Sequence, residues 1–434
     1  MPSHQRPPRI PVLLGTQTLF NIGFYAVVPF IAVVLDADFG LGAAAVGLVL
    51  GVRTFAQQGM FLVGGGLADR IGARATILIG IAVRVSGFLA LAASLWLDPV
   101  RLWLFVAGTV LTGLGGAFFS PGLSVLVAEA DRATPPGRIT LFAWLTVTGE
   151  IGTVVGPLLG TLLMPLGFAV TAATGAALFA GIWVLLFVLL PRGSGRGAMR
   201  GVDQRPESAP DAGGDAIHPP PTARDGKPFP ALRDRPFVAF ACLHSVDLLA
   251  YNQLYLTLPL ALVRSGAGAG AVALMFIWVS ILTLALQLPI ARWAARRERR
   301  TALRAGYLSQ ACSYLVLAGG SATGTVTAPG VGTVLVMISV TFLILGHLAA
   351  QPTAMSFVPV IAESRPTGSY FGLLATTGGF AVLLGNVAAG RLMDLADAVP
   401  VAGAAPWLFL ALLPAISALC VGRVLAALRR SGRG

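Results

Sequence analysis

The chain has 434 residues, of which 56% are hydrophobic and only 11% are charged. Soluble domains carry about 25% charged residues, so this composition excludes an ordinary soluble protein and favours a chain that crosses a bilayer many times. The net charge of +12 does not indicate nucleic-acid binding, because the basic residues fall in segments that would all lie on one side of a membrane. The exceptions are Arg53, Arg84, Arg101, Arg264 and Arg391.

Apolar runs of about 20 residues predict an all-α membrane protein with twelve spans and both termini in the cytoplasm. A segment rich in proline and charge, 191–235, separates six spans from the next six and predicts a disordered cytoplasmic linker. The expected domains are therefore an N-terminal half, 1–190, and a C-terminal half, 236–434. The predicted spans are 11–35, 42–66, 76–97, 102–128, 138–164, 167–190, 236–262, 270–291, 303–320, 330–359, 367–392 and 405–428.

A short charged turn joins the second and third predicted spans. Its glycines permit close backbone approach, and its defining residues are Gly65, Asp69, Arg70, Gly72 and Arg74. This turn resembles the signature loop of major facilitator superfamily transporters, whose fold has two six-helix halves. The resemblance implies that the aspartate meets the N-terminus of the eleventh span and latches the outward-open state, while the two arginines tie the loop down. A loop whose charges only set the membrane topology is the alternative.

A second motif lies in the fifth predicted span and consists of Gly152, Gly156, Pro157 and Gly160. It resembles the motif of facilitator-family antiporters, in which glycines and a proline kink one helix and permit tight packing, so it favours an exporter. A plain contact between small residues on neighbouring helices is the alternative. In the fourth span, the residues 113–117 resemble the end of a drug-antiporter motif, but a threonine stands at position 109, where the family has an arginine.

Three further segments resemble the MdtH-type multidrug-resistance branch of the superfamily, a twelve-span branch of drug:proton antiporters. They are 49–59, 289–293 and 368–372, and they fall in both halves of the chain. The segment 390–394, which runs from Gly390 to Asp394, has letters similar to the charged turn but ends the eleventh span on the other side of the membrane. We therefore expect only local packing there.

Two acidic residues, Glu150 in the fifth span and Asp247 in the seventh, lie deep in the predicted membrane. Ionisable side chains are costly at that depth and mark functional sites. A proton-coupled transporter needs a carboxyl group that takes up and releases a proton there, so we expect proton coupling at both. The alternative is a structural pairing with the two deep cations, Arg53 and Arg84, because two acids and two bases would leave the interior neutral.

Polar side chains within the spans are the expected substrate cavity. Two stripes follow one face of a helix: Arg53 with Gln57, and Asp247 with Tyr251 and Tyr255. Aromatic faces suit lipophilic or cationic compounds, although hydrogen bonding between helices explains isolated polar residues equally well. The other expected cavity residues are Asn21, Tyr25, His347, Gln351 and Asn386.

The chain shows no P-loop, metal-ligand spacing or nucleophile motif, so we expect no enzyme activity, no cofactor and no bound metal. The predicted function is proton-coupled secondary export of lipophilic or amphipathic small molecules, that is, multidrug efflux by alternating access in the bacterial cytoplasmic (inner) membrane. The alternatives are a proton-coupled importer or exporter of one metabolite or sugar and, in a different class, a channel or membrane sensor. The expected partners are the small-molecule substrate, protons and the lipid bilayer, without nucleic acid, and the expected functional unit is a monomer.

Overall fold

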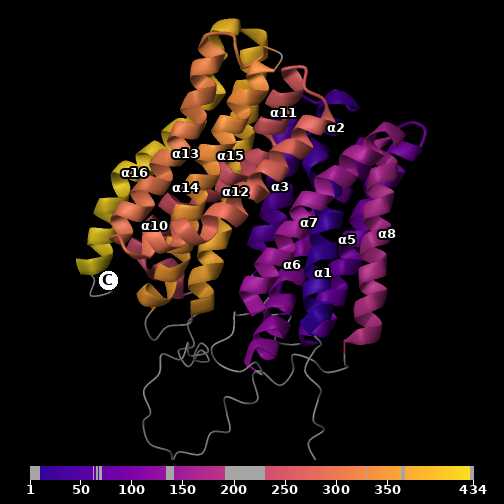
Figure 1. The fold of residues 1–434 in the computed structure, drawn as a ribbon, viewed down its shortest axis with the longest axis horizontal. Helices are drawn as coiled ribbons and strands as arrows, with labels where there is room; N and C mark the ends of the chain where they lie inside the picture. The colour runs from indigo at the N-terminus through magenta and orange to yellow at the C-terminus, as the bar shows by residue number, and fades with distance from the viewer. Residues whose placement is uncertain are drawn as a thin grey trace, which may run out of the picture.

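The computed structural model describes residues 10–61, 63–64, 67, 71–132, 141–190, 230–328, 330–362 and 367–430. Within these ranges every regular element is a helix, and the helices stand side by side in one bundle (Figure 1). This confirms the all-α membrane fold. The two ends of the bundle are called the upper and the lower end, as they stand in Figure 1; α8 (Phe168–Leu189) begins at the upper end and ends at the lower.

The helices that come before α8 form one side of the bundle together with it, coloured indigo to magenta in Figure 1. The first of these rods runs through a 3-10 turn, η1, at which Pro29 cannot donate the backbone hydrogen bond that an α-helix needs. The elements are α1 (Ile10–Val27), η1 (Val28–Phe30), α2 (Ile31–Ala37), α3 (Ala43–Gly59), α5 (Ala73–Trp96), α6 (Leu102–Arg132), α7 (Leu141–Leu163) and η2 (Met164–Leu166).

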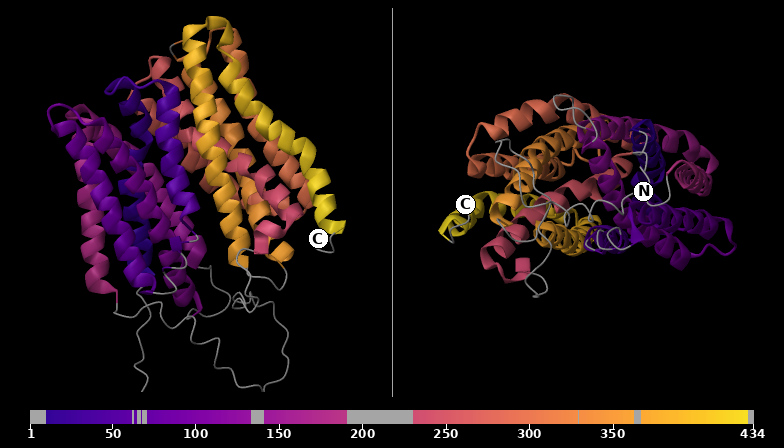
Figure 2. Two further views of the ribbon diagram at one scale, coloured as in Figure 1. Left: turned by 180° about the vertical axis from the view of Figure 1, so that it is seen from behind. Right: turned by 90° about the horizontal axis from the view of Figure 1, so that it is seen from below.

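The remaining helices form the other side of the bundle, and seen from below the two groups lie next to each other (Figure 2). Their first rod repeats the break of the first group, because α10 passes through the 3-10 turn η3 into α11, and η3 contacts η1. The elements are α9 (Pro230–Arg233), α10 (Arg235–Asn252), η3 (Gln253–Tyr255), α11 (Thr257–Arg264), α12 (Ala269–Ala295), α13 (Arg299–Ala322), α14 (Val331–Ala362), α15 (Thr367–Ala398), η4 (Pro400–Ala402) and α16 (Ala405–Arg430).

Among the described residues, ten helical rods are long and apolar enough to cross a membrane, and each coincides with a predicted span. The two other predicted spans correspond to α3, of which 17 residues are described, and to α13, whose first turns carry three arginines. Large apolar side chains on the outside of the bundle, such as Leu162 and Val188, are 73% and 71% exposed. Contact with lipid tails explains this exposure, which water would penalise.

The start of the second half lies earlier than the sequence predicts. Pro230–Arg233 and Arg235 are helical, although the predicted linker extends to 235. Asp234 caps α10 by accepting a hydrogen bond from the backbone N–H of Phe237, at 3.3 Å, and Pro236 has the backbone angle that a first helical turn requires. The residues 191–229 of the predicted linker lie outside the described part of the chain.

The most extensive contact between the two sides of the bundle is that of α3 with α15. Gly47 lies against the backbone oxygen of Asn386, and Gly51 lies against the backbone of Leu383. A Cβ atom at either glycine would collide with the opposite helix, so the absence of a side chain allows the close approach. Towards the lower end this contact reaches the rings of Phe55 and Phe380, whose centroids are 4.6 Å apart.

Candidate functional site

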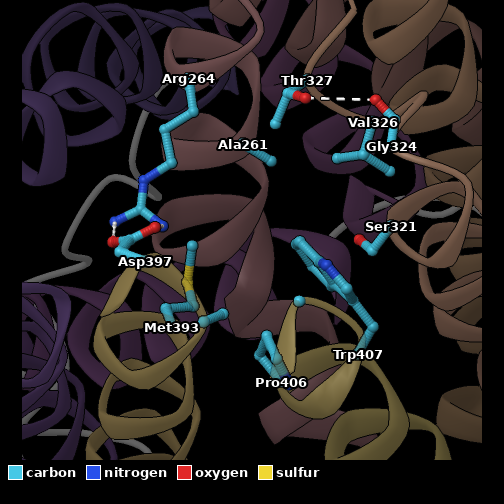
Figure 3. A pocket seen from close by; sticks show the side chains of 12 residues that line it. Ala261, Arg264, Ser321, Gly324, Val326, Thr327, Met393, Asp397, Pro406 and Trp407 are labelled. Carbon is cyan, nitrogen blue, oxygen red and sulfur yellow. Dashed lines mark hydrogen bonds and ion pairs between the residues drawn. The ribbon is translucent and has the colours of Figure 1, made fainter. Parts of the chain in front are cut away.

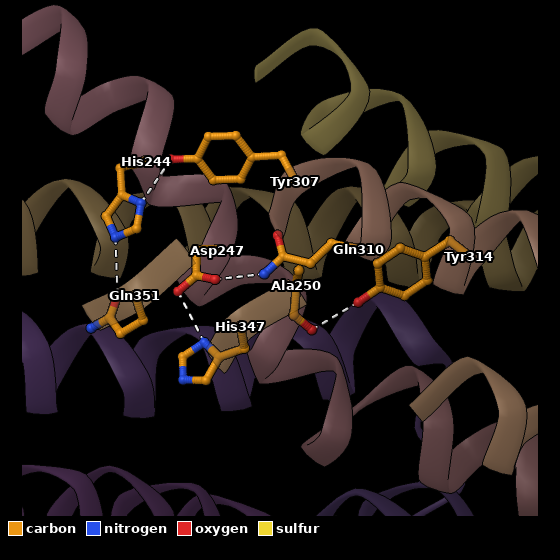
Figure 4. A network of polar contacts seen from close by, with 8 residues as sticks. All are labelled: His244, Asp247, Ala250, Tyr307, Gln310, Tyr314, His347 and Gln351. Atoms are coloured by element: carbon orange, nitrogen blue, oxygen red, sulfur yellow. Dashed lines mark hydrogen bonds and ion pairs between the residues drawn. The ribbon is translucent and has the colours of Figure 1, made fainter. Parts of the chain in front are cut away.

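Asp247 lies at the centre of a polar network inside the second half (Figure 4). The residue is 1% exposed, and its carboxylate accepts a hydrogen bond from Gln310 Nε2 at 2.5 Å. The other carboxylate oxygen lies 3.0 Å from Nδ1 of His347, which is close enough for an ion pair when the imidazole is protonated. The deep acid of the second half is therefore partnered by an imidazole and an amide from α14 and α13.

His244, one turn before Asp247 on α10, extends the same network, and the sequence analysis did not include it among the site residues. Its Nδ1 lies 2.8 Å from the Tyr307 hydroxyl, and its Nε2 lies 3.0 Å from Oε1 of Gln351. An amide oxygen can only accept, so in the neutral imidazole the tautomer that fits both contacts has the proton on Nε2 and accepts from the tyrosine at Nδ1. A sequence signal for His244 was present: it lies three residues before the deep acid Asp247, and this spacing places both on one face of the helix.

His347 connects this buried network to the middle of the molecule. Its side chain is 22% exposed, compared with 1% for the carboxylate of Asp247. Its ring lies 4.4 Å from the ring of Tyr251 between their centroids. The geometry therefore allows a proton to reach the buried carboxylate through a more accessible imidazole.

Glu150, the deep acid of the first half, has a different environment. It lies on α7, and one of its carboxylate oxygens is buried without a hydrogen bond among the described residues. α7 packs against α12 of the other side of the bundle, where the buried hydroxyl of Ser280 lies close to this carboxyl group. The carboxyl group is thus placed between the halves, and one of its oxygens is free of hydrogen bonds among the described residues.

The alternative interpretation, a structural pairing of the deep acids with Arg53 and Arg84, is not seen among the described residues. Within the described residues, neither arginine forms a salt bridge with Glu150 or Asp247. The guanidinium of Arg84 lies over the ring of Phe20, 4.3 Å from its centroid, with two further phenylalanine rings within 5.4 Å. Aromatic faces attract a cation electrostatically, so the rings take the place that a carboxylate would have in the alternative interpretation.

Arg53 is 3% exposed and lies 5.1 Å above the ring of Phe24. Its Nε donates to the hydroxyl of Thr112 at 3.3 Å, and its Nη2 is buried without a hydrogen bond among the described residues. Gly113 and Gly116 of α6 give both arginines room, because a Cβ at the first would meet the backbone of Arg53 and a Cβ at the second would meet the guanidinium of Arg84. The glycine motif of the fourth span thus accommodates cations from neighbouring helices.

The antiporter-type glycines hold α7 against α1. Gly152, Gly156 and Gly160 recur every four residues on one face of α7, and a Cβ at any of them would collide with α1. Asn21 of α1 donates from Nδ2 to the carbonyl of Gly149 at 2.9 Å, which fixes the same contact. The described geometry is a small-residue helix contact with Pro157 inside α7, and an antiporter role for the motif stays a prediction.

Aromatic and amide side chains meet where the halves contact each other. The hydroxyl of Tyr255 lies 3.4 Å from that of Tyr25. Asn386 is fully buried; its Nδ2 donates to Asn252 Oδ1 at 3.1 Å, and its own Oδ1 accepts from Gln253 at 2.9 Å. Asn386 therefore joins helices in this conformation, and its role in a substrate cavity stays a prediction, as does that of Gln57.

The charged turn of the first half is described only in part. Gly72 has a φ of 91°, which favours glycine, and forms the N-cap of α5. Arg74 donates from Nη2 to the carbonyl of Phe187 on α8 at 2.7 Å, so it ties the turn to a neighbouring helix as expected. Gly65, Asp69 and Arg70 lie outside the described residues, and the predicted latch at Asp69 cannot be compared with the structure there.

A cavity of about 270 Å³ lies at the upper end of the second half, away from the polar network (Figure 3). Trp407 and Met393 form part of its apolar wall. On one side it is bounded by a salt bridge between Arg264 and Asp397, whose charged atoms are 2.9 Å apart. This cavity lies near the end of α15 rather than at the depth of the two buried acids.

The family model described as Major Facilitator Superfamily matches residues 13–385. An uncharacterized MFS-type transporter of Mycobacterium tuberculosis (strain ATCC 25618 / H37Rv), Rv0849, is 32% identical over 398 residues, which cover 90% of this chain and 87% of the relative. The multidrug resistance protein MdtH of Escherichia coli O157:H7 is 30% identical over 411 residues, which cover 94% of this chain and 92% of that protein.

Solved structures show the same fold at low sequence identity. A POT family transporter in complex with 5-aminolevulinic acid has a TM-score of 0.74 at 14% identity, with 97% of each chain covered. The nucleoside transporter NupG has a TM-score of 0.73 at 16% identity, with 96% of this chain and 98% of that chain covered. At such identities the likeness concerns the fold alone.

Proposed function

We propose, because the chain belongs to the Major Facilitator Superfamily of secondary transporters, that it exports lipophilic or amphipathic small molecules in exchange for protons. Members of this family are transporters. An enzyme activity is therefore excluded, and a transporter takes the place of the channel and the membrane sensor among the possible functions. Transporters of this fold move two halves about a site near the middle of the membrane. The multidrug substrate class is supported by the 30% identity to MdtH over most of both chains.

The observation that carries the proposed proton coupling is the contact between Asp247 and His347. Nδ1 of His347 lies 3.0 Å from the carboxylate of Asp247, so the two groups can share a proton through a charge-assisted hydrogen bond. The buried carboxylate has no other cation beside it among the described residues, so protonation changes the net charge of the site. Such a change at membrane depth is costly unless the site opens to water or releases the proton.

The same contact suggests how substrate and proton exclude each other. The ring of Tyr251 lies against the imidazole of His347, and Tyr25 and Tyr255 meet nearby across the halves. An aromatic or cationic substrate that stacks on these rings would lie beside the imidazole, where a positive charge disfavours a second one. Glu150, which lies between α7 and α12 with one buried oxygen free of hydrogen bonds among the described residues, is the second proposed proton-coupling group.

The test is transport by the purified protein in proteoliposomes that contain ethidium as the substrate. We expect an imposed pH gradient to drive ethidium movement and a protonophore to abolish it. Asp247→Asn should lose the dependence on the gradient, whereas the matched control Asp397→Asn, which changes a 55% exposed acid at the upper end, should keep it. Ethidium movement that ignores the gradient in the unaltered protein would remove proton coupling from the proposal.

We further propose that the lower end faces the bacterial cytoplasm. The arginines at the junction of α12 and α13, including Arg299 and Arg300, lie at the lower end, and the C-terminus lies there as well (Figure 1). Positive charge concentrates on the cytoplasmic side of membrane proteins. The contact of Asp394 with the first turn of α3, at the upper end, would then close the outward side. A functional monomer in the cytoplasmic membrane completes this proposal.

A second candidate function is transport of one acidic metabolite, and the buried arginines favour it. Arg53 and Arg84 place two cations in the first half without a carboxylate partner among the described residues. A substrate carboxylate would supply the missing negative charge. The test compares binding of 1-naphthoate with that of its neutral amide. Loss of naphthoate binding alone in Arg53→Gln, and not in Arg264→Gln, favours this candidate, whereas equal binding of both compounds excludes it.

A further inference from the structure

Asp394, near the end of α15, caps the first turn of α3 from the other half of the molecule. Its two carboxylate oxygens accept hydrogen bonds from the backbone N–H groups of Ala43, at 2.6 Å, and Ala44, at 3.0 Å. The first amides of a helix have no partner within the helix, and Gly42, at the N-cap position of α3, offers no side chain. The second half therefore supplies the cap that the first half lacks.

Glycine makes this approach possible. Gly390 lies one turn before Asp394 on α15, and a Cβ atom there would collide with the backbone of Ala43 and Ala44. On the other side, a Cβ at Gly42 would press on the carboxylate itself. Backbone atoms cannot move aside as a flexible side chain can, so the contact requires both the glycine and the aspartate, four residues apart.

This finding corrects the expectation of local packing at 390–394, because the contact joins residues 351 positions apart and belongs to both halves. The spacing from Gly390 to Asp394 equals that from Gly65 to Asp69. α3 begins and α15 ends at the upper end of the bundle. The two helices are antiparallel, so α15 begins at the lower end, towards which α3 runs. The sequence thus repeats the same glycine–aspartate spacing after α3 and near the end of α15.

We propose that Gly390 and Asp394 form a latch that holds the upper end closed and that must break before this end opens. A carboxylate at a helix N-terminus is stabilised by charge-assisted hydrogen bonds and by the helix dipole. Rocking of the halves separates α3 from α15 at one end, so it removes both hydrogen bonds together. The inference rests on the alternating access of the proposed function, but on neither the substrate nor the proton.

The neighbouring salt bridge of Asp397 with Arg264 provides a matched control. It lies one turn beyond the latch on the same helix and carries the same acidic charge. Its side chains are 55% and 27% exposed, and exposed ion pairs contribute little. Loss of this acid therefore tests the charge of the region without touching the capped amides.

The experiment measures the distance between spin labels at the upper end, in the full-length protein without substrate or gradient. The labels are attached through Leu166→Cys and Val401→Cys, which are 67% and 97% exposed, after replacement of the native cysteines by serine. Asp394→Asn keeps the shape of the side chain but turns an NH₂ group towards one of the capped amides. We expect it to raise the ratio of open to closed molecules about tenfold, with Asp397→Asn unchanged.

Gly390→Ala provides the independent variant, because it pushes α3 away without a change of charge. It should populate the same longer distance in protein that elutes as a folded monodisperse species. An unchanged distance distribution in either Asp394→Asn or Gly390→Ala overturns the latch. An equal shift in Asp397→Asn would also overturn it, since the effect would then come from the general charge of this end. Failure of proton-coupled export leaves these distances unaffected, so the two proposals can fail separately.

Discussion

The two halves of the molecule treat their buried ionisable groups in opposite ways. In the second half, Asp247 and His244 each have two polar partners at hydrogen-bond distance. In the first half, Arg53 and Arg84 lie over aromatic rings, and atoms of both guanidinium groups have no hydrogen bond among the described residues. An ionisable group with two polar partners is fixed in position, whereas a charge without a hydrogen-bond partner is available to a proton, a substrate or a moving helix. The comparison teaches that the same fold can keep one half preassembled and the other half open to a partner.

Glu150 offers the largest expected effect, because it is the deep acid that has no ion-pair partner among the described residues and lies on the side of the bundle that holds the arginines. Glu150→Gln should keep the fold and lower gradient-driven transport about a hundredfold or more, since an amide cannot exchange the proton. The measurement is ethidium transport in proteoliposomes at several imposed pH gradients. If this variant keeps the wild-type dependence on the gradient, the Asp247–His347 contact is the sole coupling site. Proton coupling would then belong to the second half alone.

Arg84 tests whether the cations of the first half are structural. Arg84→Ala empties space among three phenylalanine rings and should lower the free energy of unfolding by about 2–4 kcal/mol. Arg84→Met fills the same space without a buried charge and should lie within about 1 kcal/mol of the unaltered protein or above it. Unfolding in mixed detergent micelles measures both. A methionine variant as unstable as the alanine variant would show that the charge itself is required.

Tyr251 and Tyr255 test whether the preassembled half contacts the substrate. Alanine at both positions should change the rank order of transported compounds by about tenfold between aromatic cations and neutral molecules, because stacking on the rings is lost. Expression level and gradient dependence should change less. Equal loss for every compound would indicate a role in folding, and transport of a single polar sugar by the unaltered protein would contradict the multidrug substrate class.

Thr112 offers the smallest expected effect. Its hydroxyl accepts the only hydrogen bond that the side chain of Arg53 makes among the described residues, at the long distance of 3.3 Å. Thr112→Val removes this acceptor at almost constant volume and should cost about 1 kcal/mol of stability, with transport intact. A larger loss of transport than of stability would indicate that the hydroxyl positions the guanidinium for a substrate.

Much of the fold was predictable because its signals are local. Consecutive apolar residues predict the spans. Asp234 as the cap and Pro236 in the first turn are local signals for the start of α10, but the predicted linker extended past this point. Deep polar residues such as Asp247 stood out against an apolar background. The sequence analysis failed at His244, which it did not include among the site residues, and at Asp394, whose motif was assigned to local packing.

The sequence by itself determined the membrane class, the order of the helices and the identity of the costly buried charges, since each depends on residues that are neighbours in the chain. Only the tertiary structure decided which groups meet: Asp247 with His347, 100 residues apart, and Asp394 with Ala43, 351 residues apart. The physical reason is that a helix surrounded by lipid or other apolar helices has no strongly polar face to indicate its rotation. Rotation and register are set by close packing at glycines such as Gly47, Gly152 and Gly390, and they alone bring distant polar groups to hydrogen-bond distance.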